Sequence, residues 1–311
     1  MLNELPALFI SPQFLSSIIR LATPLLIATM GGIFSERSGI LFLGMEGFML
    51  MGAFFGFLGG YYFGLWVGIL FTLIISLLAG LLYAFCVVTL AVNQVVISVA
   101  FNLFALGITS AFLRTMFGTN TSALESAVFP PLNIPLLSKI PYLGVLFQRT
   151  GFTYLGYILV PVVFIVFFKT NWGLKIRAVG EHPAAAETMG VNVNRIHYLS
   201  VLWAAVFAGI GGASQTIGDL GLFVDNMIAG KGFIGFAAIV LGRFNPIGTM
   251  IAVLFFGIVD AFQLNLQAMG STIPYQFPLM MPYLLTLIAF LIAGSGVAPK
   301  GWGTPYISEA E

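Results

Sequence analysis

Residues 62–91 read YFGLWVGILFTLIISLLAGLLYAFCVVTLA and contain no charged side chain. A helix needs about 20 apolar residues to cross the hydrocarbon core of a bilayer, which is about 30 Å thick. The stretch therefore predicts a membrane-spanning helix that is long enough to be strongly tilted or broken. Only helices and closed barrels can span a bilayer. Other apolar runs of about 20 residues, in place of alternating ten-residue segments, predict helices throughout the chain.

The composition of the whole chain agrees with this prediction. The chain has 311 residues, of which 59% are hydrophobic and 7% are charged, whereas a soluble domain carries about 25% charged residues. Because so few charges cannot cover a soluble surface of this size, we expect an integral membrane protein. The net charge of +1 gives no reason to expect a nucleic acid partner. The first ten residues lack a basic region, so no secretory signal peptide is expected.

The apolar runs predict an all-α fold, a polytopic transmembrane bundle of about nine spans (eight to ten) that forms one domain over residues 1–311. The expected spans are residues 14–34, 39–59, 62–91, 94–113, 152–170, 198–217, 226–243, 246–268 and 278–297. The seventh span is short and contains Lys231, so we expect it to be discontinuous or re-entrant. Two long connecting stretches remain, at residues 114–151 and 171–197.

Basic residues indicate the side of the membrane on which a connecting stretch lies, because they favour the cytoplasmic side of short loops. The stretch 171–197 contains or adjoins a group of them: Lys169, Lys175, Arg177 and Arg195. We therefore place that loop in the cytoplasm and the loop 114–151 outside the cell. With nine spans the N-terminus lies outside as well.

Several polar side chains fall within or beside the expected spans, where burying a charge costs at least about 2.5 kcal/mol. Such side chains tend to face a cavity or a partner. The candidate residues of a solute path are Glu46, Asn93, Asn102, Gln215, Asp225, Asn226, Asp260 and Asn265. Alternatives stay open for two of them: Glu46 lies among glycines and could bond a neighbouring backbone, and Asn93 lies near an interface and could cap a helix. A path of amides with few carboxylates suits a neutral, hydrogen-bonding solute.

The sequence offers little for catalysis or for cofactors. Cys86 is the single cysteine, which excludes an internal disulfide and a cysteine-based metal site. His182 and His197 have no neighbouring cysteine and no H-E-x-x-H pattern, so no metal site is expected. The chain has no G-x-x-x-x-G-K-[ST] sequence and is not expected to hold ATP itself. An intramembrane enzyme would need a nucleophile or a metal set that is not apparent here.

Residues 180–195, GEHPAAAETMGVNVNR, are polar and rich in alanine within this apolar chain. Pro183 suits the first turn of a helix, the residues after it favour a helix, and Gly190 suits its end. A helix of about seven residues is not stable alone, so it must dock on something. Its small side chains would fit a groove on a partner.

Three segments carry a resemblance to a known family. AVGEHPAAAETMGVNV resembles the coupling-loop motif E-A-A-x-x-x-G of ABC importer permeases: Ala185, Ala186 and Gly190 match, and Ala184 stands where the glutamate would be. ERSGILFLGMEGFMLMGA at 36–53 resembles the ERSGxxNLGxEGxM signature of the branch for branched-chain amino acids, ribose and nucleosides, with Phe42 in place of the usual asparagine. GKGFIGFAAIVLGRFNPIGT at 230–249 is similar to a further segment of that branch.

The resemblance implies a function and a set of partners. The chain would be the permease subunit of an ATP-driven importer in the bacterial cytoplasmic (inner) membrane, paired with a second, longer homologous permease. Separate cytoplasmic ATPase subunits would use the ATP and bind the coupling loop, and an extracytoplasmic binding protein or lipoprotein would deliver the solute. The chain itself would bind no cofactor. The implied coupling residues are Glu181, Pro183, Ala185, Ala186, Glu187 and Gly190.

The resemblance fits best the subgroup that transports nucleosides and simple sugars by alternating access. Purine nucleosides are the solute that we expect first. One alternative is a permease for branched-chain amino acids, which are zwitterions and would favour a strongly charged pair in the path. Another is an ion-coupled secondary transporter that uses Glu46 and Asp260. That second alternative does not explain the alanine-rich loop.

Overall fold

The computed structural model describes residues 12–118, 125–134, 143–268 and 298–307, together with residues 280–281, 284, 287–288 and 291. The α-helices with bounds are α2 (Pro12–Arg37), α3 (Met45–Phe63), α4 (Leu65–Ala84), α5 (Gln94–Phe117), α6 (Gly151–Lys169), α7 (Asn171–Glu181), α8 (Pro183–Thr188), α9 (Val193–Gln215), α10 (Lys231–Leu241) and α11 (Pro246–Ala268). A π-helical turn continues α4 (η1, Phe85–Thr89) and another continues α9 (η5, Thr216–Leu220). The remaining elements are the 3-10 helix η4 (Leu143–Phe147) and the strands β1 (Leu132–Asn133) and β2 (Gln148–Arg149).

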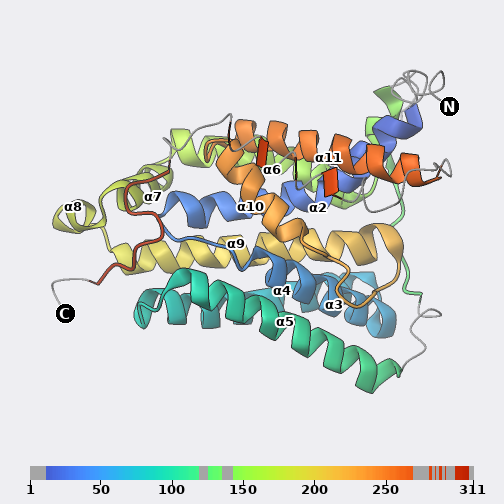
Figure 1. Ribbon diagram of the computed structural model, residues 1–311, viewed down its shortest axis with the longest axis horizontal. Helices are drawn as coiled ribbons and strands as arrows, with labels where there is room; N and C mark the ends of the chain where they lie inside the picture. The colour runs from blue at the N-terminus through green and yellow to red at the C-terminus, as the bar shows by residue number, and fades with distance from the viewer. Residues whose placement is uncertain are drawn as a thin grey trace.

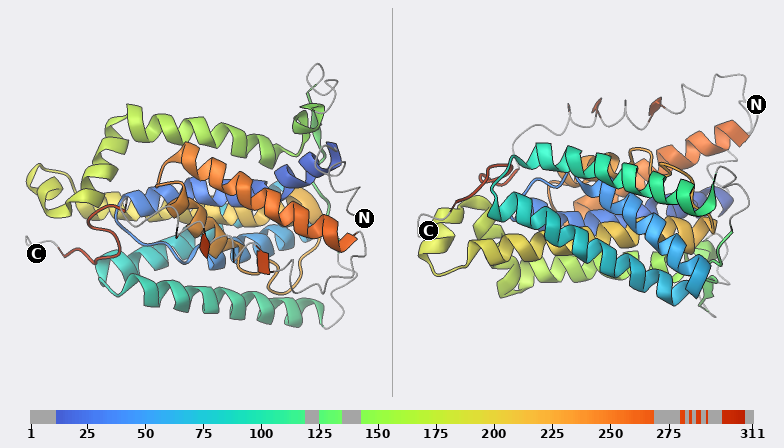
Figure 2. Two further views of the ribbon diagram at one scale, coloured as in Figure 1. Left: turned by 45° about the horizontal axis from the view of Figure 1, so that its top comes forward. Right: turned by 90° about the horizontal axis from the view of Figure 1, so that it is seen from below.

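The long helices lie side by side in one bundle (Figure 1). Its centre is formed by α9, which packs against α2, α3 and α4, and by α2, which also packs against α6, α10 and α11. Every residue of α2 from Ala22 to Glu36 is buried. Figure 2 shows the same bundle from two further sides, with α7, α8 and the C-terminal residues at one end and the start of α2 at the other.

The outer helices α4 and α5 turn large apolar side chains away from the bundle. More than half of the surface of each of these side chains is exposed: Trp66, Leu78, Leu82, Val96 and Leu103. An apolar face of this extent would be a liability in water. Lipid tails are as apolar as leucine, so the pattern is that of helices facing a bilayer.

Among the residues that the structure describes, six helices are long and apolar enough to cross a membrane: α2, α4 with η1, α5, α6, α9 with η5, and α11. α3 has 19 residues and is not one of these six helices. α10 has 11 residues and is therefore about 16 Å long at 1.5 Å per residue. The seventh expected span, 226–243, thus holds a short helix after a non-helical stretch, in agreement with the predicted interruption. The ninth, 278–297, falls largely outside the described residues.

The second expected span starts later than predicted. Residues 38–44 are not helical, and α3 begins at Met45. These residues are nevertheless inside the bundle, with Ile40 2% and Phe42 0% exposed. Their apolar character gave the sequence the appearance of a continuous span from residue 39.

Side chains from α5, a helix distant in the sequence, satisfy part of this non-helical backbone. The Leu41 N–H donates to Oε1 of Gln94, at 2.7 Å, and the carbonyl of Leu43 accepts from Nδ2 of Asn102, at 3.0 Å. Non-helical backbone at membrane depth is tolerated only where the protein itself supplies such partners. The start of α3 is therefore held partly by α5, in addition to the contacts that Ser35 and Glu36 make with residues 40 and 42.

The two expected loops also contain regular structure. α8 lies where the short helix was predicted, with Pro183 at its start. α7 was not predicted; Thr170 caps it by accepting a hydrogen bond from the Gly173 N–H, at 3.2 Å. In the loop 114–151, β1 and β2 pair antiparallel, with Leu132 opposite Arg149.

Candidate functional site

A carboxylate from α3 caps the N-terminus of α10. Glu46 accepts hydrogen bonds from the Gly230 N–H on Oε1, at 2.8 Å, and from the Gly232 N–H on Oε2, at 2.7 Å. Gly230 has a φ of 89°, a value that favours glycine, and a Cβ at Gly232 would meet the backbone of Glu46. The first N–H groups of a helix lack intrahelical partners and carry partial positive charge. Glu46 thus binds α3 to α10.

Asn102 of α5 holds the N-terminus of α3 in a similar way. Its Oδ1 accepts from the Gly47 N–H, at 2.8 Å, while its Nδ2 donates to the Leu43 carbonyl. The oxygen and the nitrogen of this amide are therefore both bonded to backbone. Asn102, which was predicted to line the solute path, thus supports the start of α3 in this conformation.

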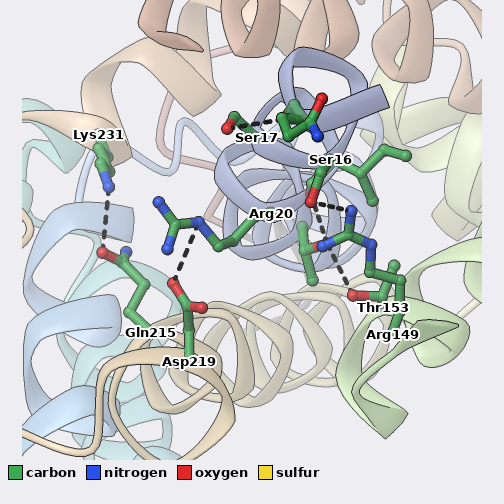
Figure 3. Close-up of polar contacts among 11 residues, drawn as sticks. Ser16, Ser17, Arg20, Arg149, Thr153, Gln215, Asp219 and Lys231 are labelled. Atoms are coloured by element: carbon green, nitrogen blue, oxygen red, sulfur yellow. Dashed lines mark hydrogen bonds and ion pairs between the residues drawn. The ribbon is translucent and has the colours of Figure 1, made fainter. Parts of the chain in front are cut away.

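Lys231, the first residue of α10, is partly buried and lies near several carboxylates of the bundle. Its Nζ donates to Oε1 of Gln215 in α9, at 3.1 Å (Figure 3). Its charge is attracted by Asp260, Asp219 and Glu46. Gln215 is 5% exposed, and among the described residues its Nε2 has no hydrogen-bond partner. An unsatisfied buried donor costs about 1–3 kcal/mol.

A second polar group lies toward the end of the bundle at which α2 begins, on one side of the group around Lys231. Nε of Arg20 in α2 forms an ion pair with Oδ2 of Asp219 in η5, at 3.8 Å (Figure 3). Both residues line a pocket of about 240 Å³ that also receives Arg149 and Thr153. The Thr153 hydroxyl lies 3.2 Å from that of Thr23, another lining residue. The pocket is thus lined by charged and hydroxyl side chains together with apolar ones such as Val128 and Phe129.

Arg149 of β2 is held in place beside this pocket. Its Nη2 donates to Oγ of Ser16, at 2.6 Å (Figure 3), and its Nε donates to the Val145 carbonyl, at 2.9 Å. Burial lowers the pKa of Arg149 from its ordinary value, but an arginine keeps its charge in proteins. The pocket therefore presents two positive charges, on Arg20 and Arg149, and one negative charge, on Asp219.

Two further predicted path residues lie in other contacts. Oδ1 of Asn93 accepts from the Val95 N–H, at 3.0 Å, and so caps α5. Asp225 accepts a hydrogen bond from the Ser110 hydroxyl and lies 3.7 Å from Nη2 of Arg114. Neither contact connects these residues to Lys231.

Asn226 and Asn265 make local contacts. Asn226 has a φ of 56°, and its carbonyl accepts from the Ala229 N–H, at 3.1 Å, in the turn before α10. Nδ2 of Asn265 donates to the Ala261 carbonyl one helical turn earlier, at 2.7 Å.

Three of the predicted path residues thus lie around Lys231, which was not among the predicted ones. The predicted residues whose charge or hydrogen bond reaches Lys231 are Glu46, Gln215 and Asp260. Sequence reasoning omitted Lys231, Arg20 and Asp219 from the path, although charge in an apolar surrounding was a signal for all three. Within the described part of the chain, no group of three or more His, Cys, Asp or Glu side chains could hold a metal ion.

α8 presents one face to its own chain and another outward. Ala186 is 6% exposed and buried by the protein, whereas Ala185 is exposed and Met189, just after the helix, is 83% exposed. Gly190 has a φ of 81°, and a Cβ there would meet nothing within 4 Å. Of the predicted coupling residues, Glu181, Ala185 and Gly190 are exposed, Pro183 and Glu187 are partly buried, and Ala186 is buried.

The acidic residues on either side of Pro183 contact the C-terminal residues. Oε2 of Glu181 accepts from the Lys300 N–H, at 3.5 Å. The Tyr306 hydroxyl donates to Oε2 of Glu187. The region predicted to couple to an ATPase is thus joined to the end of the chain.

The chain is similar to proteins of one transport family. It is 36% identical over 299 residues to the guanosine ABC transporter permease protein NupQ of Bacillus subtilis, which covers 92% of this chain and 93% of that protein. It is 36% identical over 298 residues to the nucleoside ABC transporter permease protein NupC of Lactococcus lactis (92% and 94%). It is 34% identical over 271 residues to the putative glucose ABC transporter permease protein TsgC13 of Haloferax volcanii (85% and 81%). No solved structure matches the chain.

The family model described as "Branched-chain amino acid transport system / permease component" matches residues 14–293. That range includes α3, α10 and the charged group around Lys231 as well as α7 and α8. The six helices able to cross a membrane lie within or across it. The chain therefore belongs to the family of branched-chain amino acid transport system permease components and is a multi-pass protein of the cytoplasmic membrane.

Proposed function

We propose that the chain is the permease subunit that moves nucleosides through an ATP-driven (ABC) importer by alternating access. Purine nucleosides are the first candidate among them. The observation that carries this proposal is the 36% identity, over nearly the whole chain, to permeases named for guanosine and for nucleosides. The chain is a transport subunit and not an enzyme, and a separate ATPase hydrolyses the ATP. A simple sugar is the second candidate, because a further relative is named for glucose.

The Nε2 donor of Gln215, beside Lys231 and unsatisfied within the described part of the chain, supports a path for a neutral solute. The Lys231 ammonium is bonded to Gln215 and attracted by the surrounding carboxylates, while Nε2 of Gln215 has no partner among the described residues. A nucleoside offers hydroxyl and ring acceptors to such a donor and carries no charge. Glu46 has both oxygens occupied by backbone N–H groups. This argues against a zwitterionic amino acid paired to Glu46 and against ion coupling through it.

The pocket beside Arg20 supports an entry site at the opposite end of the bundle from α8. Its volume of about 240 Å³ is near the lower end of small-molecule sites, which begin at about 300 Å³. Phe129 lines it together with Arg149 and Asp219. An aromatic ring can stack on a nucleobase, and the charged groups can bond its polar edge. A solute delivered by an extracytoplasmic binding protein would enter here.

The proposed topology has nine spans, with the 171–197 loop in the cytoplasm and the 114–151 loop outside. It adds α3, the interrupted segment that contains α10, and residues 278–297 to the six helices that are long enough to cross. Lys169, Lys175 and Arg177 lie at or near α7, which fits the preference of basic residues for the cytoplasmic side. Arg20 of this pocket belongs to α2, whose first turns lie at the end of the bundle away from α7 (Figure 1).

The proposed partners are an ATPase, a second permease and a binding protein. The ATPase docks on the outward face of α8, where Ala185, Met189 and Gly190 are exposed. A homologous permease completes the solute path, and lipid contacts the apolar faces of α4 and α5. The chain binds no cofactor in this proposal.

The test is uptake by proteoliposomes that contain the chain with its permease, ATPase and binding-protein partners. Radiolabelled guanosine, adenosine, glucose and leucine are compared with and without ATP. Guanosine uptake that needs ATP and stops with vanadate is expected. Preferred uptake of leucine would refute the solute assignment. Uptake that persists without ATP but collapses with an uncoupler would refute the ATP-driven mechanism.

A further inference from the structure

The last described residues of the chain, 298–307, fold back onto the bundle. We call them the C-terminal segment, and Figure 1 shows them beside α7. The Gly301 N–H donates to the carbonyl of Gly180 in α7, and the Gly303 N–H donates to the carbonyl of Gly39, both at 2.9 Å. A Cβ on Gly301 would lie 2.9 Å from the Gly180 oxygen. The segment is therefore clamped between the end of α7 and the start of the connection from α2 to α3.

Trp302 occupies the centre of these contacts. Its indole N–H donates to the carboxylate of Glu36, which is fully buried and accepts the Phe42 N–H on Oε1, at 2.7 Å. Its ring stacks on Phe236 of α10, with centroids 6.1 Å apart and planes at 7°, and meets Phe244 edge-on at 5.7 Å. The Trp302 side chain therefore contacts the end of α2 and α10 directly. Through Glu36 it is also linked to the connection between α2 and α3.

Tyr306 and Lys300 connect the same segment to α8. The Tyr306 hydroxyl donates to Oε2 of Glu187, within α8, and the Lys300 N–H donates to Oε2 of Glu181, just before it. α8 and α10 are far apart in the sequence, yet the C-terminal segment contacts both. The contacts of the ten residues 298–307 thus connect α8 to α10, the helix that begins with Lys231.

We propose that Trp302 and Tyr306 are positioning residues that transmit movement of α8 to α10 and to the start of α3. The inference rests on the proposed function, in which an ATPase moves α8. A packed chain of contacts can carry coupling energy only if the elements at its two ends change together. Glu46 ties α3 to α10, so a displacement delivered through Trp302 reaches both helices and shifts the charges around Lys231.

Changes at Trp302 should impair the coupling of ATP hydrolysis to transport without impairing assembly with the ATPase. The outward residues of α8 are not altered by changes at Trp302, so the ATPase still binds. Trp302→Ala removes both the bond to Glu36 and the stacking on Phe236. Trp302→Phe keeps an aromatic ring for Phe236 and loses only the bond to Glu36. Tyr306→Phe loses only the hydroxyl that bonds Glu187.

The first experiment measures ATP hydrolysed per solute transported by the reconstituted complex. Trp302→Ala is expected to raise this ratio about tenfold, within the usual range of coupling between sites, while the ATPase stays bound. Trp302→Phe and Tyr306→Phe are expected to give smaller increases. Ile307→Ala is the matched control, since Ile307 is 72% exposed, and should leave the ratio unchanged. Equal ratios in Trp302→Ala, Tyr306→Phe and the parent chain would overturn the proposal, as would a proportional loss of uptake and hydrolysis in Tyr306→Phe.

The second experiment needs no solute. Spin labels are placed at Phe233→Cys in α10 and at Val96→Cys in α5, both exposed positions, in a Cys86→Ser chain. Trapping the ATPase with vanadate and nucleotide is expected to change the distance between the labels, and Tyr306→Phe and Trp302→Ala to reduce that change. A constant distance in the parent chain would overturn the proposal. If the complex moved another solute than guanosine, the solute assignment would fail, yet this measurement would still test the segment.

Discussion

Oε2 of Glu46 accepts a hydrogen bond from the Gly232 N–H at 2.7 Å, and this contact joins the first turn of α3 to the first turn of α10. Oε1 accepts the Gly230 N–H in parallel. Two helices that both begin inside the bundle are thereby attached to each other at their N-termini. The positive partial charge at the start of α10 is balanced from within the chain.

The first prediction concerns loss of this carboxylate. Glu46→Ala leaves two backbone N–H groups without their acceptor, at a cost of about 1–3 kcal/mol for each, and Glu46→Gln keeps one acceptor oxygen. Thermal unfolding in detergent should therefore rank the parent chain above Glu46→Gln and Glu46→Gln above Glu46→Ala. Glu125→Gln, at an exposed position, serves as the control. An unfolding temperature of Glu46→Ala equal to that of the control would contradict the capping role.

The second prediction concerns the space beside Glu46. Gly232→Ala places a Cβ against the Glu46 backbone, and such overpacking costs about 1–3 kcal/mol. Gly107→Ala in α5 is the matched control, because a Cβ there meets nothing within 4 Å and alanine favours a helix by about 0.5–1 kcal/mol over glycine. The two substitutions should shift the unfolding temperature in opposite directions. Shifts of the same sign and size would show that α10 does not pack closely on α3.

The third prediction concerns the charge that faces Lys231. Asp260→Asn removes an attraction that stabilises the Lys231 charge. ATP-driven uptake should fall about tenfold, equivalent to about 1.4 kcal/mol in a barrier. Gln267→Ala, farther along α11 and exposed, should change uptake little. Equal effects of the two changes would place the solute path elsewhere.

The fourth prediction separates the two faces of α8. Ala185→Trp enlarges the exposed face and should abolish co-purification of the ATPase without lowering the unfolding temperature. Ala186→Trp inserts the same bulk into a buried position and should lower that temperature. Gly190→Arg should abolish transport with expression intact. An ATPase that still bound Ala185→Trp at normal strength would refute docking on this face.

Most of the helices could be predicted because a bilayer requires long apolar runs, and such runs are visible in a single sequence. α8 was also predictable, since Pro183 and Gly190 punctuate a short helix. The start of α3 was not, because the backbone of residues 38–44 is held by Gln94 and Asn102 of another helix. Nothing within those residues reveals that support.

The candidate site was predicted only in part, for a related reason. Intramembrane charge pointed to Glu46 and Asp260, but their partners depend on how α10 is placed. Glu46 contacts residues that are 184 and 186 positions away, and Lys231 reaches Gln215 across the non-helical stretch between η5 and α10. Distances of this kind follow from topology, which a pattern of apolar residues does not specify.

The non-helical stretch at residues 38–44 also has a consequence for the order in which the chain assembles. A nascent chain that ends before Gln94 leaves the Leu41 N–H without its acceptor and, before Asn102, leaves the Leu43 carbonyl and the Gly47 N–H without theirs. Unpaired backbone groups are costly in the hydrocarbon core. α3 therefore reaches its final depth only after α5 has been synthesised and inserted, so these two helices mature together although α4 emerges between them.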